Sequence, residues 1–384
     1  MKLFYEWGTR QFQKYGEELC GDNVAIARHA DSVTLALSDG LGSGVKANIL
    51  SMLTSRIVMH LMENELPLPE VVETLSRTLP VCEVRNLAYS TFAIGQFFSD
   101  GRARVVEFDT PPIIVLRRRR CVPVPCEERQ IEGKTIRECE IDLEVGDFIL
   151  LVSDGVLNAG IGGLYPLGWG FDKIVRFLEE HSHQDLTAQQ LADKLGETVR
   201  ELYCDRPGDD VSVVVVKARR KLVATILTGP PVHRAADESV AARFAQRPGL
   251  LAVCGGTTAQ IVARYLGGKS LEVDLATMKQ DVPPLARLQG IDLITEGILT
   301  LTKTNELLQS GADKETVQFN TDGASALLRL CLDADHIHFM VGLSVNPAHQ
   351  NPDLPAQLGM KLATVRSIAE ELRKRDKEVT IETV

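Results

Sequence analysis

The chain has 384 residues, of which 44% are hydrophobic and 24% are charged, and its formal net charge is −10. This length predicts two domains, and the composition is that of an ordinary globular protein. The negative net charge argues against nucleic acid as a partner, because a phosphate backbone is bound through clustered Lys and Arg. The one basic run, residues 117–120, is interpreted as a solvated strand end.

Short apolar runs bounded by turn residues predict strands in the first half of the chain. These runs are Thr34–Leu37, Thr91–Gln96, Ala103–Phe108, Ile113–Leu116, Phe148–Val152 and Val211–Val216. Apolar residues spaced three and four apart predict a helix over Gly44–Met62, and further helices are expected near residues 170–181 and 187–203. The first half is therefore mainly β, with a few helices.

From residue 221 onward, strand-like runs alternate regularly with helical stretches, which is typical of a layered α/β domain. The runs are "LVATIL", "LLAVC", "SLEVDL", "IDLIT", "HIHFMV" and "EVTIETV". The change of pattern near the basic residues 219–221 predicts a domain boundary, with one domain over 1–218 and another over 222–384.

The eight cysteines are scattered and include no Cys-x-x-Cys pair, the spacing that structural zinc and redox sites prefer. We interpret them as buried or incidental thiols rather than disulfides, consistent with a reducing compartment. No window approaches the ~20 apolar residues of a membrane span, and the first residues lack a signal-peptide core. We therefore expect a cytoplasmic protein that does not engage membranes. The cysteines are Cys20, Cys82, Cys121, Cys126, Cys139, Cys204, Cys254 and Cys331.

Acidic residues stand at the ends of several predicted strands in the first half. Asp39 and Asp154 each follow an apolar strand and precede glycine, Asp209 and Asp210 precede the last strand, and Asp22 precedes another. Mg²⁺ and Mn²⁺ take oxygen ligands from a few carboxylates and keep several waters. One Asp-Gly after a strand is an ordinary turn, but the repeated pattern predicts a divalent metal site.

The ordered motifs of this half resemble the metal-dependent protein phosphatases of the protein phosphatase 2C class, and more closely the bacterial branch typified by stage II sporulation protein E. The motifs are "GDN", "LALSDGLGSG", "YSTFAIGQ", "FDTPPIIVLRR", "LEVGDFILLVSDGVLNA" and "GDDVSVVVVK". The resemblance covers residues 1–218 and implies an α+β fold, a four-layer α-β-β-α sandwich. The alternation of strands and helices after residue 221 predicts that a separate α/β layered, Rossmann-like domain follows it. The resemblance also implies hydrolysis of phosphoserine or phosphothreonine in proteins.

The resemblance further implies a site with two Mn²⁺ or Mg²⁺ ions that activate water, with no side-chain nucleophile. Asp39 would bridge the ions, the Gly40 carbonyl would bind one of them, Asp154 and Asp209 would hold the other, and Asp22 would contribute directly or through water. Asp209 is preferred to Asp210, a choice that the sequence leaves open. Arg10, the nearest candidate for a phosphate-binding arginine, lies in a poorly matching segment and is interpreted as a surface strand residue.

The substrate expected from the resemblance is a small bacterial regulatory phosphoprotein, such as an anti-sigma-factor antagonist. Two alternatives remain open at this stage. The first is a phosphatase fold that has lost activity and serves as a scaffold or sensor, and the second is a phosphatase of small metabolites.

The second half contains one stretch that suggests a ligand site. In "LLAVCGGTTAQIVARYLG" an apolar strand passes through Gly255, Gly256, Thr257 and Thr258 into an amphipathic helix. Such a helix N-terminus is a ready anion site, although Thr257 or Thr258 could simply cap the helix. We expect a small anionic ligand or partner to bind here and to regulate the phosphatase.

Overall fold

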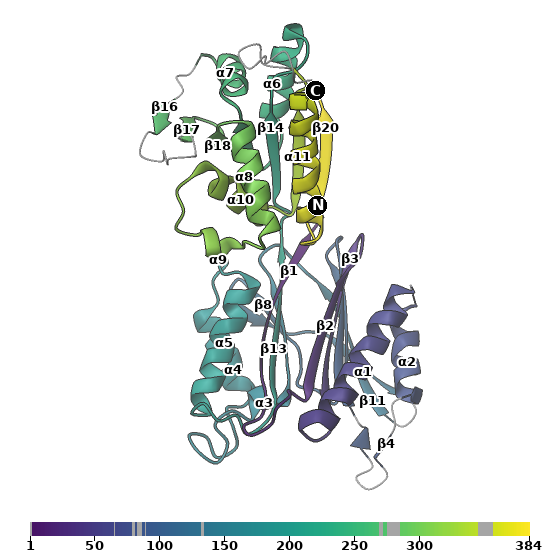
Figure 1. Cartoon of the computed structure of the whole chain (residues 1–384). Coiled ribbons are helices and arrows are strands. Elements are labelled where there is room, and N and C mark those ends of the chain that lie inside the picture. Colours follow the sequence, from purple (N-terminus) through teal and green to yellow (C-terminus); the bar gives the residue numbers. More distant parts are fainter. Residues whose placement is uncertain are drawn as a thin grey trace. The chain divides into compact units, whose positions relative to one another are not determined.

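The computed structural model describes residues 2–64, 66–78, 81–82, 87–88, 90–131, 134–268, 272–274, 285–344 and 356–384. The side chains of residues 76, 81–82, 87–88, 272–274, 285 and 356–359 lie outside this description. Contacts within the chain divide it into two compact units, Met1–Arg220 (unit 1) and Lys221–Val384 (unit 2). Figure 1 shows the elements of each unit.

Unit 1 contains a five-stranded sheet in the order β1-β13-β12-β8-β9, in which every neighbouring pair is antiparallel. Its strands are β1 (Phe4–Phe12), β13 (Val211–Arg219), β12 (Phe148–Val152), β8 (Ile114–Arg117) and β9 (Arg120–Val122). The two central strands are buried along nearly their whole length, which matches the continuous valine and leucine runs of the sequence.

The second sheet of unit 1 has six strands in the order β10-β11-β7-β6-β3-β2, again antiparallel throughout. Its strands are β10 (Cys126–Ile131), β11 (Lys134–Asp142), β7 (Arg102–Phe108), β6 (Ser90–Phe98), β3 (Ser32–Gly40) and β2 (Asp22–Arg28). A short separate hairpin joins β4 (Val81–Cys82) to β5 (Leu87–Ala88). Tyr89 of the motif "YSTFAIGQ" lies outside the described residues.

Three hydrophobic clusters arrange unit 1 as helix, sheet, sheet, helix. One cluster joins the inner faces of both sheets, including Leu35 and Val105 with Ile149 and Val214. A second packs α1 (Gly44–Glu63) and α2 (Leu68–Thr78) on the six-stranded sheet, and a third packs the other helices on the five-stranded sheet. Those helices are α3 (Asp154–Leu157), α4 (Phe171–His181) and α5 (Ala188–Leu202). The mixed α+β prediction for this unit is confirmed.

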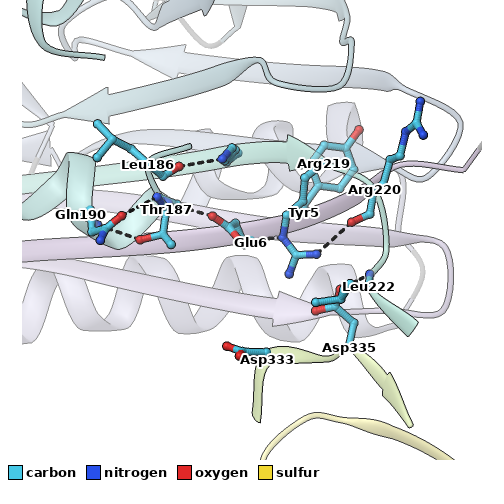
Figure 2. A network of polar contacts seen from close by, with 12 residues as sticks. Tyr5, Glu6, Leu186, Thr187, Gln190, Arg219, Arg220, Leu222, Asp333 and Asp335 are labelled. Atoms are coloured by element: carbon cyan, nitrogen blue, oxygen red, sulfur yellow. Dashed lines mark hydrogen bonds and ion pairs between the residues drawn. The ribbon is translucent and has the colours of Figure 1, made fainter. Parts of the chain in front are cut away.

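The N-terminus of α5 is fixed to the neighbouring strands β1 and β13 of the five-stranded sheet (Figure 2). Thr187 and Gln190 form a capping box, with the Thr187 side chain accepting from the Gln190 N–H. Glu6 of β1 accepts from the N–H of Ala188 at 2.9 Å and from Nε of Arg219 at 2.6 Å. One carboxylate thus joins the first strand, the last strand and a helix.

The prediction that all cysteines are unpaired is wrong for Cys126 and Cys139. These residues face each other across β10 and β11 and form a disulfide, with their Cα atoms 4.1 Å apart. The register of the hairpin produces this pair, and sequence spacing alone does not show that register. The remaining cysteines whose side chains the structure describes are free thiols: Cys20, Cys121, Cys204, Cys254 and Cys331.

Unit 2 contains a seven-stranded sheet in the order β16-β17-β18-β15-β14-β19-β20. The five strands from β18 to β20 are parallel to one another, and the β16–β17–β18 edge is antiparallel. The strands are β14 (Val223–Thr228), β15 (Leu250–Cys254), β16 (Glu272–Asp274), β17 (Leu285–Leu288), β18 (Ile291–Thr295), β19 (His336–Val341) and β20 (Glu378–Thr383).

Two hydrophobic clusters of unit 2 contain sheet residues, each together with a different set of helices. One cluster contains residues of α6 (Asp237–Ala245), which follows the short helix η1 (Arg234–Ala236), and of α7 (Gly256–Tyr265). The other contains residues of α8 (Ile298–Gln309), α9 (Lys314–Val317), α10 (Gly323–Asp333) and α11 (Ala356–Arg373). Within the described residues, every helix falls short of the length or apolarity needed to cross a bilayer.

Candidate metal centre

The first pair of predicted ligands lies on neighbouring strands of the six-stranded sheet. Asp22, the first residue of β2, is the direct cross-strand partner of Asp39 near the end of β3. Asp22 is only 3% exposed, and neither of its carboxylate oxygens makes a hydrogen bond of ordinary geometry in the described structure, although the hydroxyls of Ser212 and Ser153 partly lower its pKa. A buried carboxylate with so little compensation is costly unless a cation balances its charge.

The second group of acids lies at the end of the five-stranded sheet. Asp154 begins α3 directly after β12, and residues 209–210 form the turn that leads into β13. The N–H of Ser153 donates to the Ser212 carbonyl at 3.0 Å, and the N–H of Ser212 donates to Oγ of Ser153 at 2.8 Å. These bonds hold the Asp154 turn against the Asp209–Asp210 turn.

The two adjacent acids of that turn have different surroundings. Asp210 is 3% exposed, and its Oδ1 accepts from the N–H of Lys14 at 3.0 Å. Asp209 is less buried, and its Oδ1 accepts from the N–H of Asp210 at 3.0 Å. Asp210 therefore helps to fix the chain near Lys14, and Asp209 is the more accessible of the two carboxylates.

Electrostatics connects the acids of the two sheets. Burial raises the pKa of Asp39, and the charges of Asp22, Asp154, Asp209 and Asp210 raise it further. Burial likewise raises the pKa of Asp22 and of Asp154, with additional repulsion from neighbouring acids in each case. The predicted ligands thus share one electrostatic environment. A bound cation would stabilise these five carboxylates in their charged form.

Sequence reasoning missed one acid of this environment. The charge of Asp109, in the motif "FDTPPIIVLRR", contributes to the raised pKa of Asp154. Asp109 is exposed and has a φ of 53°, a left-handed conformation that is uncommon outside glycine. The sequence signal was an acid at a strand end before Thr-Pro-Pro, which is indistinguishable from an ordinary turn.

The donor set suits a hard divalent cation, although the acids do not form a closed cage. In the described part of the chain, no three His, Cys, Asp or Glu side chains stand close enough together to hold one ion between them. Mg²⁺ typically binds one or two carboxylates and keeps several waters, so a closed cage of protein ligands is not required. The unpartnered oxygens of Asp22 beside Asp39 are the feature that fits such an ion.

Two glycines allow the backbone to pack closely around these acids. A Cβ on Gly40 would lie 2.1 Å from the carbonyl oxygen of Ala47 in α1, and a Cβ on Gly155 would lie 2.1 Å from that of Asp210. The hydroxyl of Tyr203 donates to the Gly155 carbonyl at 2.8 Å. The Asp-Gly pairs of the sequence are therefore required by packing as well as by the turns.

The arginines that the sequence singled out have structural partners. Arg10 lies on β1, with Nη1 at 4.0 Å from the Asp193 carboxylate, as expected for a surface strand residue. Arg117 pairs with the buried Asp147 at 2.7 Å. Because Leu116 lies opposite Phe148, Arg117 is at the end of β8 that faces away from Asp154.

The comparisons with known proteins agree with this architecture. Residues 29–219 match the family model of stage II sporulation protein E (SpoIIE). The PP2C phosphatase domain of SpoIIE from Bacillus subtilis, solved with a fragment of its regulatory domain, is 21% identical with a TM-score of 0.50, over 57% of this chain and 64% of that chain. Another structure of the B. subtilis SpoIIE phosphatase domain is 20% identical (TM-score 0.45, 57% and 94% covered), and RsbX in complex with magnesium is 16% identical (TM-score 0.42, 56% and 95% covered).

Unit 1 therefore has the fold of a PP2C-type phosphatase. Within that class, residues 29–219 match the SpoIIE family model, which confirms the resemblance that the ordered motifs predicted. No curated protein matches the chain. The family match does not extend into unit 2.

Proposed function

We propose that unit 1 is a metal-dependent phosphatase that hydrolyses phosphoserine or phosphothreonine in a bacterial regulatory protein. The observation that carries this proposal is the buried Asp22 carboxylate, which makes no hydrogen bond of ordinary geometry and lies opposite Asp39 of the segment that matches the SpoIIE family model. An inactive scaffold would gain stability by replacing these acids, because a buried uncompensated charge is destabilising. Their retention favours an enzyme over a scaffold or sensor.

In this proposal Asp39 and the Gly40 carbonyl bind divalent cations together with Asp154 and Asp209, and Asp22 contributes directly or through water. A pair of Mn²⁺ or Mg²⁺ ions supplies an activated water and neutralises phosphate charge. The protein holds the carboxylates at two strand edges, and Tyr203 and Ser153 keep the Gly155 and Asp210 turns in place. Asp109, whose charge already acts on Asp154, is a further candidate for this set.

The test measures phosphate release from phosphoserine and phosphothreonine peptides and from small phosphorylated metabolites, with EDTA, Mn²⁺ or Mg²⁺. We expect release from the peptides only with added metal, and a decrease of kcat by a factor on the order of 10² or more in Asp39→Asn. Asp31→Asn, an exposed acid paired with Lys2, is the matched control and keeps full activity. Activity in EDTA would refute the metal mechanism, and preference for metabolites would favour the metabolite alternative.

We further propose that the two units are separate domains, 1–218 and 222–384, and that the second is a Rossmann-like α/β domain that regulates the first. A small phosphoprotein of the anti-sigma-factor antagonist kind is the proposed substrate. In support, structures similar to parts of this chain include the RsbU and RsbW domains of Rv1364c from Mycobacterium tuberculosis and a protein of the bacterial stressosome. Copurification of the phosphorylated target with metal-free Asp39→Asn tests the substrate.

A further inference from the structure

Four neighbouring parallel strands of unit 2 end level with one another, at the same edge of the sheet. The aligned residues across the sheet are Val341, Thr228, Cys254 and Thr295. The residues that follow them are Gly342, Gly229, Gly255 and Glu296. The chain runs from β14 outward to β15 and β18 and then returns to β19 on the other side of β14. Ligands of open α/β sheets bind outside the carboxyl ends of strands near such a reversal.

Of the three helices that follow β14, β15 and β18, α7 begins without a carboxylate. The first turn of α6 carries Asp237 and Glu238, and Glu296 accepts from the N–H of Leu299 at the start of α8. The first turn of α7 has no acidic residue, and its N-cap, Gly255, provides no side chain. A Cβ on Gly256 would meet no atom within 4 Å, so the space beside this first turn is open.

A buried hydroxyl points toward the same turn. Thr258, in the first turn of α7, is only 2% exposed, and its Oγ1 has no hydrogen-bond partner in the described structure. That oxygen is the nearest atom, at 3.2 Å, to the position that a Cβ of Gly255 would occupy. The hydroxyl therefore does not cap the helix, contrary to the simpler interpretation of the sequence, and it stands ready to bind a ligand in the turn.

A cation lies near the ends of the adjacent strands. Nζ of Lys361 in α11 donates to the Gly342 carbonyl at 3.2 Å and lies 2.3 Å from the position of a Cβ on Gly229. Burial lowers the pKa of this half-buried lysine. Since neighbouring strands are about 5 Å apart, Lys361 lies within electrostatic range of the Gly255 turn.

The geometry points to a site for the phosphate group of a small molecule at the ends of β14, β15 and β19, bound by the N-terminal N–H groups of α7, by Thr258 and by Lys361. The free N–H groups of a helix N-terminus and its dipole favour an anion, and the lysine supplies the countercharge. The three strand-end glycines bring the backbone close to this position. This site is independent of the phosphatase activity proposed for unit 1.

The test uses the full chain in EDTA, so that a metal-assisted phosphate interaction in unit 1 does not contribute. The probes are inorganic phosphate, pyrophosphate and AMP, and the readouts are calorimetric affinity and hydrogen exchange of the backbone amides of residues 256–259. We expect saturable binding that slows exchange of these amides. Tighter binding of AMP than of inorganic phosphate would indicate a phosphorylated metabolite, and the reverse would indicate free phosphate.

Matched variants separate this site from adventitious binding. Lys361→Gln is expected to weaken binding about tenfold or more, as for loss of a charged hydrogen bond. Thr258→Val is expected to weaken it about threefold to tenfold, as for loss of a neutral hydrogen bond. Lys374→Gln, at an exposed lysine directly after α11 that pairs with Glu371, should leave the affinity unchanged. Thr300→Val should also leave it unchanged, because this buried threonine lies in the first turn of α8, where Glu296 already accepts a backbone N–H.

Absence of binding by all three probes in the wild-type chain would overturn the proposal. Binding that is equally strong in the wild type, Lys361→Gln and Thr258→Val would also overturn it, because the anion would then lie elsewhere. Circular dichroism checks that each variant is folded. If Lys361→Gln is unfolded, the affinity of Thr258→Val alone tests the proposed site.

Discussion

Asp22 and Asp39 are cross-strand neighbours, and the carboxylate of Asp22 is buried there without a hydrogen bond of ordinary geometry in the described structure. Two adjacent buried acids destabilise a fold unless a cation or a proton compensates them. In the absence of a cation, these two acids therefore lower the free energy of unfolding of unit 1, as is common at sites that bind ions.

The Asp22→Asn variant is expected to be more stable than the wild type in EDTA. The substitution removes a buried charge at nearly constant volume, and we expect a gain of about 1–3 kcal/mol in the free energy of unfolding. Urea unfolding followed by fluorescence measures it, because the two tryptophans of the chain, Trp7 and Trp169, both belong to unit 1. With saturating Mn²⁺ the wild type should become more stable than the variant, because the ion stabilises the wild type more. A less stable variant in EDTA would show that Asp22 has a structural role instead.

The Gly155→Ala variant is expected to unfold unit 1 at lower denaturant concentration. Its Cβ would lie 2.1 Å from the Asp210 carbonyl oxygen, which belongs to the backbone and cannot move aside cheaply. We expect a loss of about 3 kcal/mol or more from this overpacking. Gly163→Ala is the control, because the nearest atom to its Cβ would lie at 3.5 Å. Equal midpoints for both variants would contradict the close packing of these two turns.

The Cys126–Cys139 disulfide predicts that a reducing agent destabilises unit 1. The bond closes a short loop between residues 13 positions apart, and its loss costs about 3 kcal/mol by the chain-entropy estimate. Cys139→Ser should show the same loss in oxidising buffer and no further loss with dithiothreitol. Cys204→Ser, at an exposed free thiol, should behave as the wild type. Mass spectrometry of the unreduced chain checks whether the bond is present.

Unit 2 is expected to lose stability as the pH falls below about 6.5. Burial lowers the pKa of His338 from its ordinary value of 6.5, while its hydrogen bond with Glu382 opposes that shift, and burial also lowers the pKa of His336. The unfolded chain then takes up protons at a higher pH than the folded chain, so stability is complete above 6.5 and declines as the pH falls through it. Arg243 and Arg247 lie nearby and disfavour the protonated His338.

Hydrogen exchange of the β19 amides, corrected for intrinsic rates, measures this dependence at pH 7.5 and 5.5. His338→Gln should reduce the difference in protection between the two pH values. An unchanged difference in this variant would assign the effect to other groups.

Prediction from sequence worked best where burial is continuous. The strand expected at Phe148–Val152 has those bounds in the structure, and the helix expected from Gly44 begins there, because uninterrupted apolar runs and helical spacing are both visible in one dimension. The β10–β11 hairpin was missed because most of β10 is exposed and carries charged residues, so its strand pattern is weak. Its disulfide was missed for the same reason.

The candidate site was likewise predictable only in part from the sequence. The acids after strands were visible as Asp-Gly turns, but the difference between Asp209 and Asp210 depends on the backbone of Lys14, which lies far away in the sequence. Asp109 could not be separated from an ordinary turn. In unit 2, the alignment of three glycines at neighbouring strand ends requires the sheet register, which the sequence does not contain.

The pairing of β1 with β13 has a consequence for how the protein is made. Phe4 lies opposite Arg219, and Phe12 lies opposite Val211. The strand β1 therefore cannot pair until β13, the last strand of unit 1, has been synthesised. During synthesis the N-terminal residues leave the ribosome long before their partner, and closing such a long loop is slow. The apolar strands between them are exposed to the cell until residue 219 emerges. A ribosome that stalls within unit 1 would therefore release a chain prone to aggregation, and chaperone binding to nascent chains should end soon after β13 has left the exit tunnel.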